Sequence, residues 1–227
     1  MIQRKLFHLF NGLLILYFYD THITHTLATF YMFSVFLGVT GIEYLRLNYE
    51  TINRLVEWCK ITKKTEVDSI SAAWFYALGC LGVVWLCDHD TALMAITYLA
   101  LGDSMASIIG SSSQATTSSQ ATTSSPTTSS PTTSSLTTLW LLGAPEKHLT
   151  GLLAGWAAGC IGVFWLMWWG RISNDISVIY VMYTSMVAML IETISTPLVK
   201  KYHNYIDDNL VIPMSVILWR PFRLFPN

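Results

Sequence analysis

Charged side chains are scarce in this sequence. Asp, Glu, Lys and Arg make up 12% of the 227 residues, hydrophobic residues make up 52%, and the mean hydropathy is +0.45. An ordinary soluble domain carries about twice that share of charge. The net charge of −1 also provides no basic field that would attract nucleic acid. The composition therefore predicts a polytopic membrane protein and argues against a nucleic-acid-binding one.

Cysteine is scarce too, and its spacing argues against two common uses. The four cysteines form no CxxC pair and lie in or beside apolar runs, so neither a disulfide framework nor a zinc site is indicated. We expect small core residues at Cys59, Cys80, Cys87 and Cys160. The first apolar segment has no small-residue cleavage site and contains the polar residues His8 and Asn11, so we expect it to remain as a span.

Apolar runs predict an all-α transmembrane bundle of about six to seven spans. The candidate spans are residues 6–19, 27–45, 70–87, 91–109, 149–169 and 176–198, with 210–219 as a partial seventh. Spans one to four occupy residues 1–110 and the later spans residues 139–227. Residues 47–69 are more polar and have a single apolar stripe, which predicts an interfacial helix. Glycines at 151, 155, 159 and 162 predict a close packing face on span five.

A Ser/Thr-rich stretch separates the two groups of spans. Residues 111–138 repeat short units such as SSQATT and SSPTT, with no charged residue and almost nothing to bury. Such a composition cannot form a core and predicts a flexible linker.

The basic residues predict the orientation of the chain. A cytosolic N-terminus places most Lys and Arg residues on cytosolic segments, as membrane topology favours. The same assignment brings most of the charged side chains to the cytosolic ends of the spans. Glu43 and Arg46, at the end of the second span, are expected to meet water there.

One ionisable residue, Asp103, lies within the apolar run 91–109. An aspartate at the centre of a span costs roughly 2.5 to 3.5 kcal/mol, so it usually faces a polar cavity or lies near a helix end. Small residues nearby, among them Gly102 and Ser104, allow a backbone or a ligand to approach. Asp103 is therefore a candidate site residue, with a carboxylate capped by a neighbouring helix as the alternative.

Other charged residues share the predicted cytosolic face and extend this candidate site. Carboxylate oxygens suit a hard cation, and Lys and Arg suit phosphate. Phosphoryl or nucleotidyl transfer requires little beyond such positioning and a base that accepts the proton of the attacking hydroxyl. A set of interfacial ion pairs and helix caps is the alternative. The carboxylates are Asp103, Glu192, Asp207 and Asp208, and the basic residues are Arg4, Lys5, Arg46 and Lys147.

Four motifs in fixed order resemble those of a known family. They are RKLFH at 4–8, EYLRLN at 43–48, LGDS at 101–104 with Gly110, and DDNLVIP at 207–213. Together they resemble the CTP-dependent diacylglycerol kinases of the endoplasmic reticulum. The wider group of these enzymes includes dolichol, polyprenol and phytol kinases and, more distantly, phosphatidate cytidylyltransferases. The resemblance implies a multi-pass enzyme of the endoplasmic reticulum membrane or nuclear envelope. Its implied reaction transfers the gamma-phosphate of CTP to diacylglycerol, giving phosphatidate, with magnesium or calcium as cofactor.

The resemblance also implies roles for individual residues. Catalysis would fall to Asp103, Asp207 and Asp208. The nucleotide and its phosphates would be bound by Arg4, Lys5, His8, Arg46, Lys147 and Asn209. The metal would be held by Asp103, Glu192, Asp207 and Asp208.

The sequence departs from the family pattern after Gly110. The family usually has a basic, glycine-containing segment that leads to KSLxG, whereas this chain has the Ser/Thr-rich stretch followed by EKHLTG at 146–151. Lys147 and Gly151 keep the frame of that motif. Two alternatives therefore stay open beside the diacylglycerol kinase: a dolichol, polyprenol or phytol kinase, and a membrane scaffold of the same fold that has lost catalysis.

Overall fold

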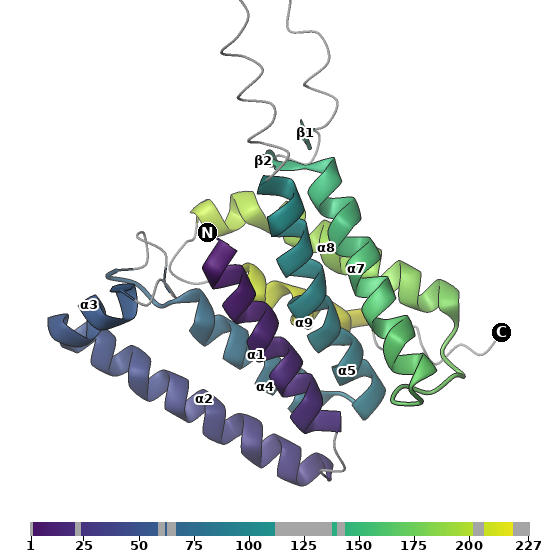
Figure 1. The fold of residues 1–227 in the computed structure, drawn as a ribbon, viewed down its shortest axis with the longest axis horizontal. Coiled ribbons are helices and arrows are strands. Elements are labelled where there is room, and N and C mark those ends of the chain that lie inside the picture. The colour runs from purple at the N-terminus through teal and green to yellow at the C-terminus, as the bar shows by residue number, and fades with distance from the viewer. Residues whose placement is uncertain are drawn as a thin grey trace, which may run out of the picture.

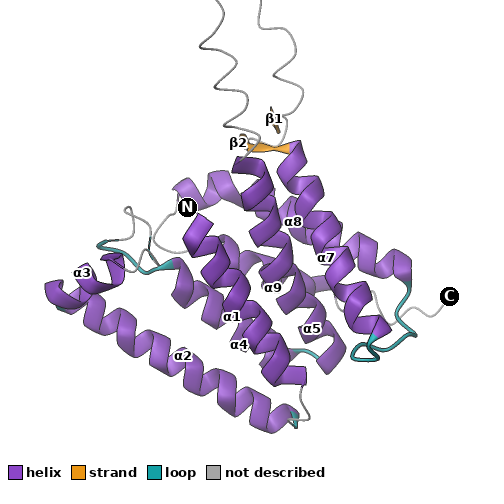
Figure 2. Cartoon of the chain, in the orientation of Figure 1, coloured by secondary structure: helices purple, strands orange, loops and turns teal. Residues whose placement is uncertain are grey.

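The computed structural model describes residues 2–20, 24–58, 62, 67–111, 138–139, 144–201 and 207–219, without the side chains of some residues at element ends. Its helices are α1 (Ile2–Asp20), α2 (His25–Asn48), α3 (Glu50–Trp58), α4 (Ala72–Leu86), α5 (His89–Thr97), the π-helical segment η2 (Tyr98–Asp103), α7 (Leu149–Trp168), α8 (Val178–Lys201) and α9 (Asp208–Trp219). A short antiparallel pair, β1 (Thr138–Leu139) and β2 (Ala144–His148), lies beside the start of α7 (Figure 2). The predicted helical architecture is confirmed, whereas this pair was not predicted. The predicted linker, apart from its two ends, lies outside the described residues.

Three described helices are long and apolar enough to cross a membrane. They are α2, the continuous helix His89–Ser111 that contains α5 and η2, and α7. Shorter apolar helices occupy the other predicted runs, at Lys5–Tyr19, Ala72–Leu86, Val178–Ile194 and Asn209–Leu218. The described helices are thus compatible with a membrane protein. The predicted interfacial segment is represented by α3, which is shorter than the predicted range and buries none of its side chains.

The continuous helix His89–Ser111 forms the centre of the bundle. It is the most buried of the three long helices, and residues such as Leu93, Ile96 and Leu99 lie in the core. The chain alternates in direction through α1, α2, α4, the central helix and α7, so the start of α1, the end of α2, the end of the central helix and the start of α7 lie toward one end of the bundle (Figure 1). Residues far apart in the sequence can therefore meet at that end.

Glycines let the central helix and α7 pack at backbone distance. A Cβ atom added to Gly155 would lie 2.8 Å from the carbonyl oxygen of Gly102, and one added to Gly151 would lie 2.7 Å from that of Ala106. Such separations are too short for a real side chain. The packing face predicted on span five is confirmed, and its partner is the helix that carries Asp103.

Candidate functional site

The strongest candidate site is a buried ion pair between Lys5 of α1 and Asp103. Lys5 Nζ lies 2.8 Å from Asp103 Oδ1 and 2.7 Å from Oδ2, and Asp103 is 2% exposed. The two residues are 98 positions apart in the sequence. A buried carboxylate requires such a partner because desolvation penalises an isolated charge. The pair therefore explains how Asp103 is tolerated inside an apolar helix.

A local change of helix type lies next to this pair. Residues Tyr98–Asp103 form a π-helix within the otherwise α-helical segment His89–Ser111. Single π turns are frequent at functional sites, and they shift the direction of the side chains that follow. Just after this turn, Ser104 Oγ donates to the carbonyl oxygen of Lys5 at 3.5 Å. Sequence analysis did not predict the π turn, because the α-helical spacing of apolar residues does not reveal it.

His8 lies one turn after Lys5 and contacts a residue that sequence analysis missed. The His8 and Tyr76 rings have centroids 5.1 Å apart, and the Tyr76 hydroxyl donates to the carbonyl oxygen of His8 at 3.3 Å. Gly12 gives room for this contact, because a Cβ atom added there would lie 2.5 Å from the Tyr76 hydroxyl oxygen. Tyr76 is set in the apolar run of α4, where an aromatic residue is unremarkable, so the sequence held no signal for its role.

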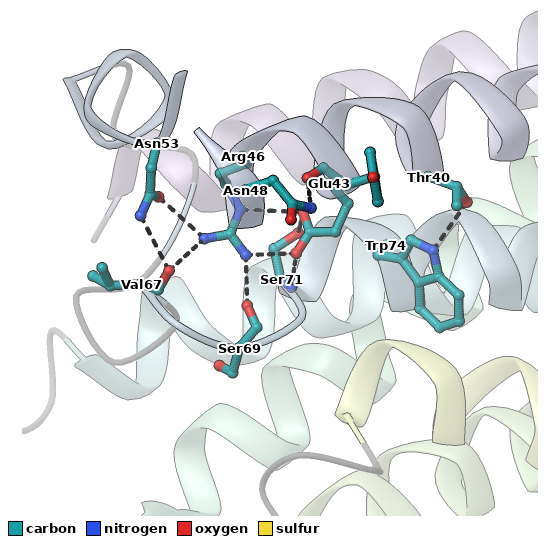
Figure 3. Close-up of polar contacts among 10 residues, drawn as sticks. Thr40, Glu43, Arg46, Asn48, Asn53, Val67, Ser69, Ser71 and Trp74 are labelled. Atoms are coloured by element: carbon teal, nitrogen blue, oxygen red, sulfur yellow. Dashed lines mark hydrogen bonds and ion pairs between the residues drawn. The ribbon is translucent and has the colours of Figure 1, made fainter. Parts of the chain in front are cut away.

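A second buried ion pair, between Glu43 and Arg46, ties α2 to two other segments (Figure 3). Arg46 Nη2 lies 2.5 Å from Glu43 Oε1 and donates to the Ser69 carbonyl, also at 2.5 Å. Arg46 Nη1 donates to Asn53 Oδ1 at 3.2 Å and to the Val67 carbonyl at 3.1 Å. Arg46 is 1% exposed. The expectation that this end of α2 meets water is wrong, because these neighbours enclose both charges.

Asp207 and Asn209 form a third polar group at the start of α9. Asp207 Oδ1 accepts from the backbone N–H of Asn209 at 2.9 Å and from Asn209 Nδ2 at 2.5 Å. Asn209 Nδ2 also lies 3.5 Å from the carbonyl oxygen of Ala72, the first residue of α4. Both side chains are buried. This contact brings the DDNLVIP motif to the same end of α4 that Glu43 holds.

Not every predicted site residue belongs to these groups. Glu192 is buried on α8, and the side chains of Arg4, Lys147 and Asp208 lie outside the described residues. Among the side chains that the structure describes, no three His, Cys, Asp or Glu residues are close enough to hold a metal ion together. The predicted metal set of Asp103, Glu192, Asp207 and Asp208 stays a prediction.

The described residues include one cation and two carboxylates of the kinds that bind phosphate and a metal ion. Lys5 carries a charge of the kind that binds phosphate, and Asp103 and Asp207 offer carboxylate oxygens to a cation.

Comparison with known proteins identifies no relative: no family model matches the sequence, and neither a curated protein nor a solved structure matches it.

Proposed function

We propose that this protein is a membrane lipid kinase that transfers the gamma-phosphate of CTP to diacylglycerol and releases CDP. The observation that carries the proposal is the Lys5–Asp103 pair. It joins two of the motifs on which the resemblance rests, RKLFH and LGDS, although they are far apart in the sequence. A cation and a carboxylate held together at the end of an apolar bundle are two of the groups that a phosphoryl transfer to a lipid alcohol uses.

The proposed reaction assigns a task to each described polar residue. Asp103 accepts the proton of the diacylglycerol hydroxyl, whose oxygen forms the new bond to the gamma-phosphorus while the bond to the beta-phosphate oxygen of CTP breaks. Lys5 binds the phosphates as a point charge. Asp103 and Asp207 would supply oxygen ligands of the kind that magnesium prefers, and bound magnesium would neutralise charge on the phosphates.

The proposal includes a topology. Six to seven spans with a cytosolic N-terminus, in the endoplasmic reticulum membrane, would place Lys5, Asp103 and Asp207 toward the cytosolic side, where CTP is present. Two observations support this arrangement: the distribution of Lys and Arg along the sequence, and the alternating direction of α1, α2, α4, the central helix and α7 (Figure 1). Glycosylation tags near His89 and Asn174 should be modified, and a tag within residues 112–137 should stay unmodified.

A direct assay tests the proposed activity. Membranes that contain the full chain, supplied with diacylglycerol and gamma-labelled CTP, should form labelled phosphatidate, and Asp103→Asn should abolish the product. Parallel reactions with ATP, dolichol and phytol establish the donor and the acceptor. No product above a vector control with any of these acceptors would contradict a lipid kinase.

A structural scaffold is the second candidate function. It is favoured by the closed Lys5–Asp103 pair, in which the lysine already neutralises the carboxylate, and by the departure from the family motif after Gly110. A scaffold predicts inactive wild-type membranes, together with a stability that depends on the pair.

A further inference from the structure

The beginning of α4 is held by a carboxylate from another helix. Ser71, the N-cap of α4, donates its backbone N–H to Glu43 Oε1 at 2.7 Å and its hydroxyl to Glu43 Oε2 at 2.9 Å (Figure 3). A carboxylate at a helix N-terminus pairs with a donor that the helix leaves unpaired, and it interacts favourably with the helix dipole. Arg46 binds the same carboxylate. Glu43 therefore fixes where α4 begins relative to α2.

The next residue of α4 contacts the predicted site on α9. The carbonyl oxygen of Ala72 faces Asn209 Nδ2, which with the Asn209 backbone N–H holds Asp207 Oδ1. The two helices also meet at backbone distance, because a Cβ atom added to Gly79 would lie 2.8 Å from the carbonyl oxygen of Asn209. Because α4 and α9 lie this close at Gly79, a displacement of α4 would also move α9.

We infer that Glu43 is a positioning residue for the proposed kinase. Through Ser71 and Ala72 it sets the position of Asn209, and thereby the orientation of the Asp207 carboxylate. Helix α4 also carries Tyr76, whose hydroxyl donates to the carbonyl oxygen of His8, so the position of α4 also affects that of α1. The kinetic consequence rests on the proposed function, whereas the mechanical coupling from α2 to α9 does not.

Hydrogen exchange measures the coupling without any enzymatic assay. Glu43→Gln is compared, in the full chain purified in detergent, with wild type and with Glu50→Gln, the same change at an exposed residue of α3. The amides of Asn209, Leu210 and Val211 report on the first turn of α9. Glu43 contacts the N-cap of α4, and α9 contacts α4, so a change at Glu43 would reach these amides through α4. We expect their exchange to become about tenfold faster in Glu43→Gln and to stay unchanged in Glu50→Gln. Faster exchange confined to residues 67–76 would overturn the inference.

Kinetics of the same variants distinguish positioning from a loss of folded protein. In Glu43→Gln the magnesium concentration for half-maximal activity should rise about tenfold or more, as is usual when a residue behind a metal ligand is changed. A lower kcat with unchanged magnesium dependence would contradict positioning. An inactive wild type would contradict the proposed function alone, because the exchange experiment would still decide whether Glu43 controls α9.

A milder variant covers the case in which Glu43→Gln does not fold, since that change leaves Arg46 buried opposite a neutral group. Ser71→Ala removes only the hydroxyl donor and leaves the Glu43–Arg46 pair intact. The loss of one hydrogen bond should speed exchange on α9 by about threefold to tenfold. Wild-type exchange at these amides in a folded Ser71→Ala protein would also overturn the inference.

Discussion

The two buried ion pairs differ both in their separation along the sequence and in their surroundings. Lys5 and Asp103 come from distant segments, and the ammonium group contacts both oxygens of one carboxylate. Glu43 and Arg46 lie three positions apart on one helix, and the guanidinium group also binds two backbone carbonyls and the side chain of Asn53. The first pair joins two helices around one buried carboxylate. The second is the centre of a network that fixes backbone positions.

This difference separates two residues that were expected from the sequence to play the same role. Both Lys5 and Arg46 were expected to bind phosphate. An arginine presents its donors in a rigid fork, and in Arg46 that fork is directed at acceptors within the protein. A lysine carries a compact charge on a flexible side chain, which can turn toward a phosphate while the backbone stays in place. The comparison favours Lys5 as the phosphate ligand and Arg46 as a structural residue.

The largest expected effect comes from breaking the Lys5–Asp103 pair on one side. Lys5→Met leaves the Asp103 carboxylate buried without its lysine, which should destabilise the protein by about 3–5 kcal/mol. The double variant Lys5→Met/Asp103→Asn removes both charges and should be more stable than Lys5→Met. Thermal unfolding of the purified proteins in detergent measures both effects. If the single variant were as stable as wild type, the pair could not be a buried one.

The second test changes the form of the Arg46 cation and keeps its charge. Arg46→Lys retains the attraction to Glu43 but cannot reach the carbonyl oxygens of Val67 and Ser69 together. We expect a loss of about 1–3 kcal/mol in stability and an unchanged KM for CTP. Unfolding and kinetics on the same preparation give both values. A raised KM for CTP with unchanged stability would restore Arg46 as a phosphate ligand.

A matched change at Lys5 sharpens that comparison. Lys5→Arg also keeps the positive charge, but a larger planar group must fit where a compact ammonium contacts Asp103. We expect kcat/KM for CTP to fall about tenfold or more, because the two cations are not interchangeable at a site shaped for one of them. If Lys5→Arg retained full activity, the geometry of this cation would not matter to the reaction.

The sequence was sufficient for the helices and insufficient for the contacts between them. Apolar runs located the helices, and glycine spacing located the face of α7 that packs on the central helix. Position along a span, however, does not determine whether a charged helix end is exposed to water or buried by other segments. Glu43 and Arg46 were placed in water because the partners that enclose them, Val67, Ser69 and Ser71, lie more than twenty residues away. The π turn before Asp103 and the contact of Tyr76 with His8 depend equally on packing between distant segments.

A third ion pair, on the surface, should contribute the least to stability. Glu50 and Arg54 lie on α3 at 2.6 Å, one turn apart, with side chains 78% and 76% exposed. Water already solvates both groups, and two long side chains lose conformational freedom when they pair, so such a contact contributes about 0.3–0.5 kcal/mol at most. Arg54→Gln should therefore leave both stability and the exchange of the α9 amides within error of wild type. A destabilisation as large as that of Arg46→Lys would mean that α3 is packed against another surface in the intact protein, and that exposure in the isolated chain underestimates its burial. Agreement would instead show that charge alone does not stabilise this end of the bundle, and that the effect of Glu43 and Arg46 comes from enclosure by the backbone groups they bind.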